Sequence, residues 1–247
     1  MQKSIFAASL LLAGVAFADT SVVETEYVLG VMPVNATGKT EVILSIPWVA
    51  EGSGEDIAVS NLVKTAGLAA EHNGDTMLRW YDTQTGDYKI WHLVSRSGTN
   101  YWVEADGVNA DAREVSRGEA VLLSTTNGTF STVYVVGQVG STSSVTTTIA
   151  ASSDGDSPTY TMLAPPTATK VNLNEIVFDG TIHQKDRIVT EVSNGGLQTT
   201  FIRNGDNSKW VSMWGGEIAG VPAGKGFWYV RYGTEALSVS WSAPSAN

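Results

Sequence analysis

Two stretches of this sequence share one pattern: Arg117-Gly118-Glu119-Ala120-Val121-Leu122 and Ala223-Gly224-Lys225-Gly226-Phe227-Trp228. In each, a glycine turn leads into apolar residues, which is typical of a tight turn followed by a buried strand. An internal repeat indicates the overall architecture, so it is considered before any single predicted helix or strand.

Five more matches precede these stretches, in the same order and at similar spacing in each half. They pair Tyr27-Val28-Leu29-Gly30 with Tyr134-Val135-Val136-Gly137, Leu44-Ser45-Ile46-Pro47 with Leu163-Ala164-Pro165, Val59-Ser60-Asn61-Leu62-Val63 with Val171-Asn172-Leu173-Asn174-Glu175-Ile176-Val177, Gly74-Asp75-Thr76-Met77-Leu78 with Lys185-Asp186-Arg187-Ile188-Val189, and Tyr101-Trp102-Val103 with Lys209-Trp210-Val211. Each match is short, but their common order predicts a duplicated chain.

Each half has the pattern of a β domain. Apolar residues alternate, or come in runs of four to six rich in Val, Ile, Thr, Tyr and Trp, between Gly, Asn, Asp and Ser. The longest helical signal is Ser60 to Gly67, with Ser60 as a possible N-cap and Gly67 just beyond the end. We predict an all-β fold of two duplicated β-sandwich or β-barrel-like modules, each with at most one short helix.

The first 18 residues have the pattern of a secretory signal peptide. Lys3 precedes an apolar run from Ile5 to Phe17, and Ala16-Phe17-Ala18 is a small-x-small cleavage signature. The run is shorter than the roughly 20 residues that a membrane span needs, and no later segment is long and apolar enough. We expect residues 1–18 to be removed, residues 19–132 and 133–247 to form the two modules, and the protein to be secreted to the outside or the cell surface without a transmembrane anchor.

The composition disfavours one class of binding partner and excludes any chemistry that needs cysteine. The chain has 247 residues, a net charge of −10 and no cysteine. Nucleic acid is disfavoured because an anionic chain without a basic stripe repels a polyphosphate. The absence of cysteine excludes disulfides, thiolate metal sites and cysteine nucleophiles.

The duplicated modules, with an Asp-initiated strand and a late Gly-x-Gly-aromatic turn, resemble the tandem β modules of secreted bacterial surface or matrix proteins of unassigned function. The resemblance covers nearly all of the chain after residue 18, but its motifs are short. It implies a role at the surface or in a matrix and transfers no catalytic residue.

No catalytic constellation is found in the sequence, so we do not expect an enzyme. His72, His92 and His183 are too far apart for a spaced metal motif. Asp75 and Asp186 occupy matching repeat positions, whereas a catalytic carboxylate pair lies across one cleft. We expect each to accept hydrogen bonds from nearby backbone N–H groups at a strand start.

Two features suggest binding sites. Asp154 and Asp156 offer oxygen ligands that are compatible with weak calcium binding, although a plain hairpin tip explains them better; no other cofactor is expected. Tryptophans on strands fill β cores or project as stacking platforms for sugar rings. The candidates for exposure are Trp48, Trp214, Trp228 and Tyr229.

Two functions remain open. The first is a non-catalytic structural or self-assembling extracellular protein, such as a subunit of a surface layer, matrix or filament, whose partners are further copies or other surface proteins. The second is a carbohydrate-binding or adhesive module that uses exposed Trp residues. The β-prone segment Thr20 to Tyr27 suits strand exchange with a neighbouring subunit and suits addition to its own sheet equally well.

Overall fold

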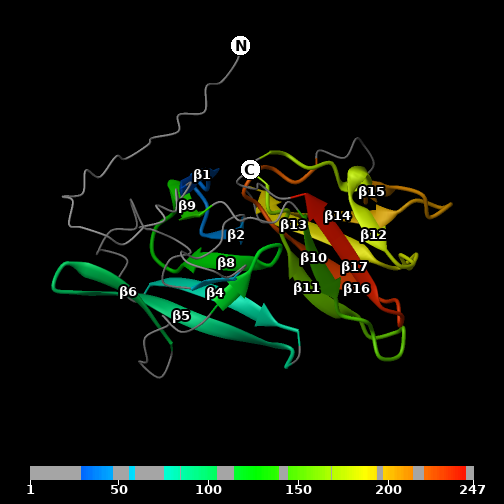
Figure 1. The fold of residues 1–247 in the computed structure, drawn as a ribbon, viewed down its shortest axis with the longest axis horizontal. Helices are drawn as coiled ribbons and strands as arrows, with labels where there is room; N and C mark the ends of the chain where they lie inside the picture. Colours follow the sequence, from blue (N-terminus) through cyan, green and yellow to red (C-terminus); the bar gives the residue numbers. More distant parts are fainter. Residues whose placement is uncertain are drawn as a thin grey trace, which may run out of the picture.

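The computed structural model describes residues 29–46, 56–58, 75–83, 85–104, 114–138, 144–167, 169–193, 197–213 and 220–242. Within these ranges the protein is all-β, as predicted, and its helical content is the short 3₁₀ helix η3 (Leu173–Glu175). The strands form two modules that lie side by side (Figure 1). The expected signal peptide and the expected helix from Ser60 to Gly67 lie outside the described residues.

The first module is built on a five-stranded antiparallel sheet. Its strands, in spatial order, are β2 (Glu41–Ser45), β8 (Ala120–Thr125), β4 (Thr76–Asp82), β5 (Asp87–Arg96) and β6 (Thr99–Glu104). Because successive side chains of a strand point to opposite faces, Leu78 of β4 is buried while Arg79 and Tyr81 face outward and are half-buried.

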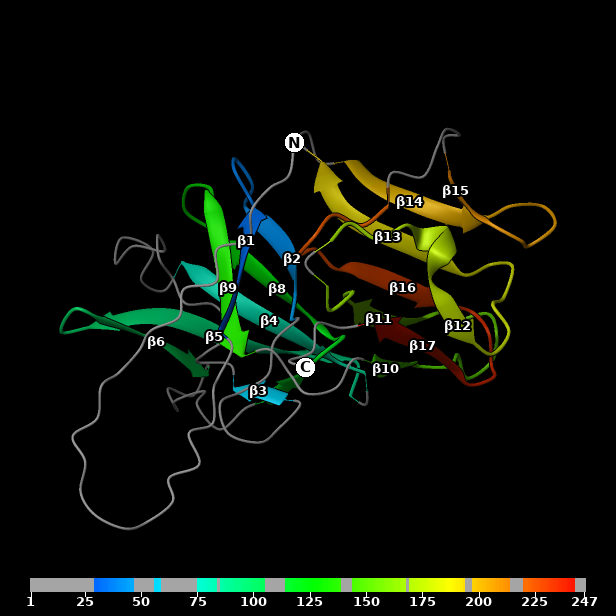
Figure 2. The ribbon, with the colours of Figure 1, turned by 45° about the horizontal axis from the view of Figure 1, so that its top comes forward.

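A two-stranded ribbon covers the inner face of this sheet. β1 (Leu29–Asn35) pairs antiparallel with β9 (Thr132–Gln138), and the ribbon crosses the sheet in Figure 2. A second pair joins β3 (Asp56–Ala58) to β7 (Glu114–Ser116). The core between ribbon and sheet includes Met32, Val34, Leu78, Trp91, Leu93, Trp102, Val133 and Val135. The module is therefore sandwich-like.

The second module repeats this strand order. Its five-stranded sheet contains β11 (Thr159–Leu163), β16 (Phe227–Arg231), β13 (Arg187–Ser193), β14 (Leu197–Arg203) and β15 (Trp210–Ser212). β10 (Ser144–Ile149), β17 (Leu237–Ser242) and β12 (Val177–Asp179) form the opposing sheet. A bridge between Val171 and Val221 takes the place of the β3–β7 pair.

The pairing registers agree with three of the six sequence matches, those at Leu44, Trp102 and Gly118. Trp102 lies opposite Leu93, and Trp210 lies opposite Arg203 at the corresponding place in the second sheet. Both tryptophans are buried. Leu44 and Leu163 likewise hold the same position in β2 and β11, which pair with the strands that follow the two glycine stretches.

Two predicted correspondences are wrong. The segment Tyr134 to Gly137 lies in β9, which pairs with β1, so it closes the first module instead of opening the second. The boundary between modules therefore lies between β9 and β10, after the expected position at residue 132. Asp186 continues the register opposite Arg231, whereas the residue opposite Thr125 is Thr76, so Thr76 and not Asp75 is its equivalent.

The modules meet through the edge strand of one sheet, β2 or β11, and the turn that precedes β16 or β8 of the other. Leu44 of β2 forms an isolated antiparallel bridge with Lys225, and Leu163 of β11 forms one with Glu119. A small apolar cluster, separate from both cores, fills this joint: Ile43, Ala120, Leu122, Met162 and Ala164.

Candidate functional site

Four aromatic rings, which we call the aromatic cluster, gather at the joint. Trp228 of β16 lies with its ring centroid 5.3 Å from Tyr81 of β4, 6.2 Å from Tyr88 of β5 and 6.4 Å from Tyr160 of β11. All three contacts are edge-to-face, the arrangement that aromatic pairs prefer. Tyr88 and Tyr160 remain 39% and 44% exposed, so the cluster reaches solvent.

Strand alternation places these rings on the outer faces of the two sheets. Phe227 and Tyr229 point into the second core, so Trp228 between them points outward. Tyr81 and Tyr88 are directly opposite each other on neighbouring strands, with centroids 5.3 Å apart. The two outer faces meet at the joint and bring the four rings together.

Trp228 is thus half-buried at the surface, whereas Tyr229 is fully buried. The expectation that Tyr229 is exposed for binding is wrong, because its ring lies in the core and its hydroxyl donates to the Asp186 carboxylate at 2.9 Å. The other two candidates, Trp48 and Trp214, lie outside the described residues. Sequence reasoning missed the three tyrosines because only the joint between modules brings them beside Trp228.

Polar groups flank the cluster. The Arg79 guanidinium donates to Ser124 at 2.8 Å and pairs with Glu41 at 3.4 Å. Burial raises the pKa of the Tyr81 and Tyr88 hydroxyls above their ordinary value of 10.0. These hydroxyls therefore stay protonated at neutral pH and are available as hydrogen-bond donors or acceptors.

The aromatic cluster has no counterpart in the repeat. In the first module, Leu122 occupies the position of Trp228. Both residues have the same place in the pairing register of their strand, and each directly precedes a residue that points into the core of its module. The position of Tyr160 is occupied by Glu41. The rings are thus a feature of one flank of the joint and are not required by the fold that both modules share.

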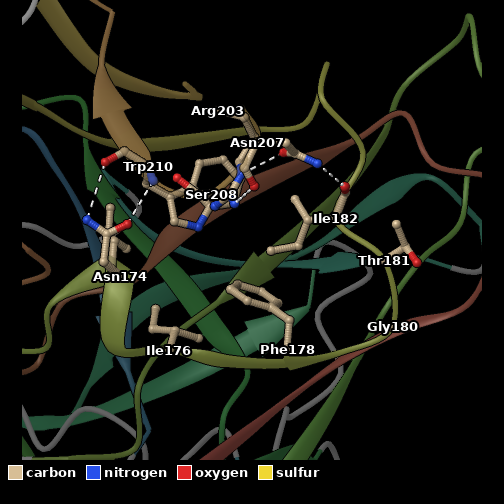
Figure 3. Close-up of a pocket in the computed structure, with 11 residues that line it drawn as sticks. Asn174, Ile176, Phe178, Gly180, Thr181, Ile182, Arg203, Asn207, Ser208 and Trp210 are labelled. Carbon is tan, nitrogen blue, oxygen red and sulfur yellow. Dashed lines mark hydrogen bonds between the residues drawn. The ribbon is translucent and has the colours of Figure 1, made fainter. Parts of the chain in front are cut away.

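The second module also carries a polar pocket of about 270 Å³, shown in Figure 3. Arg203 lies 4.9 Å above the ring of Trp210 and donates from Nε to the Asn207 side chain at 2.8 Å. Asn207, at φ 58°, donates in turn to the carbonyl of Ile182 at 3.0 Å. Burial lowers the pKa of the Arg203 guanidinium below its ordinary value. These bonds join a turn to the wall of the module, and we assign the pocket a structural role.

The Asp154 carboxylate accepts hydrogen bonds from its own loop. One carboxylate oxygen of Asp154 accepts from the backbone N–H of Ser157 at 2.7 Å and of Asp156 at 2.8 Å, and the other accepts from the Ser157 hydroxyl at 3.1 Å. Asp156 pairs with Lys185 at 3.5 Å. Within the described ranges, no group of three or more His, Asp or Glu side chains is placed to hold a metal ion.

The two carboxylates considered for hydrolysis each serve their own module. Asp186 is buried and accepts from the backbone N–H of His183 at 3.0 Å and of Tyr232 at 2.7 Å, as predicted. Asp75 instead bonds side chains, with Asn127 donating at 3.3 Å and the Thr126 hydroxyl at 3.5 Å.

Comparisons with protein families, with curated proteins and with solved structures find no match to this chain. Among the described residues, no helix has the length and apolar character to cross a membrane.

Proposed function

We propose that the protein is an exported, non-catalytic β protein that binds polysaccharide through the aromatic cluster at the joint. The observation that carries this proposal is the exposure of Tyr88 and Tyr160, both of which contact Trp228. Single exposed rings are common on protein surfaces, whereas exposed rings that contact one another form a patch, and such patches mark binding surfaces.

The chemistry of the cluster suits sugar rings. A pyranose presents a C–H face that packs on an aromatic ring and hydroxyls at its edge that need hydrogen bonds. The aromatic rings supply a surface for the C–H face, and the tyrosine hydroxyls and the Arg79–Glu41 pair supply hydrogen-bonding groups for the sugar hydroxyls. The site is an open surface, so we expect weak binding to single sugars and stronger binding to polymers that engage several copies.

Two substitutions test the proposal. We expect Tyr88→Ala and Tyr160→Ala each to weaken binding to a recognised polysaccharide by about two- to tenfold, the equivalent of one aromatic contact. Tyr134→Ala is the matched control because Tyr134 is 37% exposed on β9, in the ribbon on the other side of the first module. Affinity electrophoresis against a panel of soluble glucans, mannans, xylans and chitin oligomers measures the effect. Absence of retardation by every member of the panel, or equal loss in Tyr134→Ala, would refute the proposal.

A second candidate function is a structural, self-assembling subunit of a surface layer, matrix or filament. It is favoured by the edges of the five-stranded sheets, where β6 and β15 have no outer neighbour among the described strands. The edge strands of a sheet can pair with a strand of another chain. Tyr101 of β6 and Met213 just after β15 add exposed apolar surface, at 41% and 47%. Negative-stain imaging and light scattering of residues 19–247 test this role, since a strictly monomeric protein contradicts it.

A further inference from the structure

The contacts between the two modules come in equivalent pairs. The backbone N–H of Ser45 donates to the carbonyl of Gly224 at 2.9 Å, and the N–H of Ala164 donates to the carbonyl of Gly118 at 3.0 Å. Ser45 and Ala164 hold the same position in β2 and β11, and the glycines hold the same position in the two turns. The bridges Leu44–Lys225 and Leu163–Glu119 are related in the same way.

The glycine turns extend this symmetry. A Cβ atom on Gly118 would lie 2.4 Å from Oγ1 of Thr147 in β10, and one on Gly224 would lie 2.6 Å from Cγ2 of Val34 in β1. β1 and β10 are the corresponding first strands of the modules. Each turn therefore packs against the first strand of the opposite module, and each has the positive φ, 88° and 74°, that glycine accommodates.

The symmetry has a centre. A Cβ atom on Gly226 would lie 2.9 Å from Cβ of Ala120, its own equivalent in the first module. Residues that meet their equivalents lie on a two-fold axis, and an interface with this pattern is isologous, as in a homodimer. The joint within one chain is thus built like the interface between two identical subunits.

We propose that two copies of this chain associate by exchanging modules across this joint, so that the first module of one chain packs on the second module of the other. Every contact described for the joint would be kept, because each contact joins a residue of one module to a residue of the other. Residues 139–143 connect β9 to β10, and a tether this short favours pairing within one chain up to about millimolar concentration. Exchange is therefore expected in concentrated protein or on refolding at high concentration. This inference goes beyond polysaccharide binding and gives the self-assembling candidate a mechanism.

The absence of cysteine from the chain makes a disulfide test clean. The bonds Ser45 N–H to Gly224 and Gly226 N–H to Ile43 flank the Leu44–Lys225 pair. The pair is therefore of the non-hydrogen-bonded kind, with Cα atoms about 4.5 Å apart and side chains adjacent, within reach of a disulfide. The equivalent pair, Glu119 and Leu163, supplies a second set of variants where cysteine at Leu44 prevents folding.

In the first arm, L44C and K225C are made in separate, isotopically distinguished chains, which are refolded together at high concentration and oxidised. We expect a disulfide-linked dimer of unlike chains, which neither chain forms alone. In the second arm, L44C/K225C is oxidised at low concentration to lock the joint within one chain and is then concentrated. We expect it to remain monomeric by light scattering, and to associate after reduction.

The matched control for the lock is T146C/S240C. These exposed residues face each other within the second module, with hydroxyl oxygens 3.3 Å apart, so their disulfide leaves exchange open. Failure to form the unlike dimer in either cysteine set overturns the proposal. Association of the locked chain to the same extent as the control also overturns it, and then any assembly uses another surface. Unlike dimers from a protein that forms no larger assembly would support exchange while refuting the structural role.

Discussion

At the scale of single residues, the carboxylate of Asp186 belongs to a buried ion pair that the second module has and the first module replaces with uncharged residues. It is fully buried and accepts hydrogen bonds from the Arg231 guanidinium at 2.7 Å and the Tyr229 hydroxyl at 2.9 Å. Burial, together with the charge of Asp186, raises the pKa of Tyr229, so this hydroxyl stays a donor. The first module places Thr76 and Thr125 at the corresponding positions. The same fold thus forms with and without a buried ion pair.

Removing one partner of this pair is expected to be costly. Asp186→Thr leaves the charge of Arg231 buried without its carboxylate, which typically costs about 3–5 kcal/mol of folding free energy. The double variant Asp186→Thr/Arg231→Thr copies the first module and leaves no buried charge, so we expect it to be more stable than the single variant. Urea unfolding followed by tryptophan fluorescence compares the two. A double variant as unstable as Asp186→Thr would show that the pair is required by the second core.

The Asp154 loop makes a prediction about pH. Hydrogen bonds from Ser157 and Asp156 hold the pKa of Asp154 below its ordinary value of 3.8. A lowered folded-state pKa stabilises the fold above the unfolded pKa, and this stability is lost as the pH falls through the folded value. We therefore expect Asp154→Asn to lower the melting temperature at neutral pH and to have no effect once the pH is below the folded pKa. Thermal melts across acidic pH measure this, and an effect that persists in acid contradicts the assignment.

At the scale of elements, the turns that precede β8 and β16 determine how the modules meet. Gly224 and Gly38 have the same φ of 74°, but a Cβ on Gly224 would lie 2.6 Å from Val34 whereas one on Gly38 would meet nothing within 4 Å. Both Gly→Ala variants pay the same backbone strain. We therefore expect Gly224→Ala to be less stable than Gly38→Ala by about 1–3 kcal/mol, the usual cost of overpacking. Chemical denaturation of both variants checks this, and equal stabilities would mean that the joint yields without cost.

The sequence predicted where the strands lie better than it predicted which strands pair with one another. Alternation identified the strands, and the matches at Leu44, Trp102 and Gly118 agree with the observed registers because core and joint contacts constrain those positions twice. The match of β1 with β9 was wrong as a repeat, since two strands that pair in one ribbon can have similar patterns without being repeats. The predicted match of Asp75 with Asp186 was shifted by one residue, because the position of an Asp before a strand depends on the turn and not on strand pairing.

The site was less predictable than the fold. Alternation along β16 allows either Trp228 or Tyr229 to face outward, and only the core contacts of Tyr229 decide between them. The aromatic cluster draws its rings from four strands of two sheets. Its formation depends on the joint, for which a strand pattern contains no signal.

At the scale of the whole molecule, the protein has two separate cores coupled through a small third cluster. We expect the intact chain to unfold in one transition, and Gly118→Ala/Gly224→Ala to unfold in two, because each added methyl group overpacks the contact between its turn and the first strand of the opposite module. Differential scanning calorimetry detects the split. Leu78→Ala and Ile188→Ala, each buried in a different core, then assign the transitions, since each should lower only one of them in the joint variant. A single transition that responds to both core substitutions in the joint variant would contradict this, and would show that contacts other than the two glycine turns couple the modules.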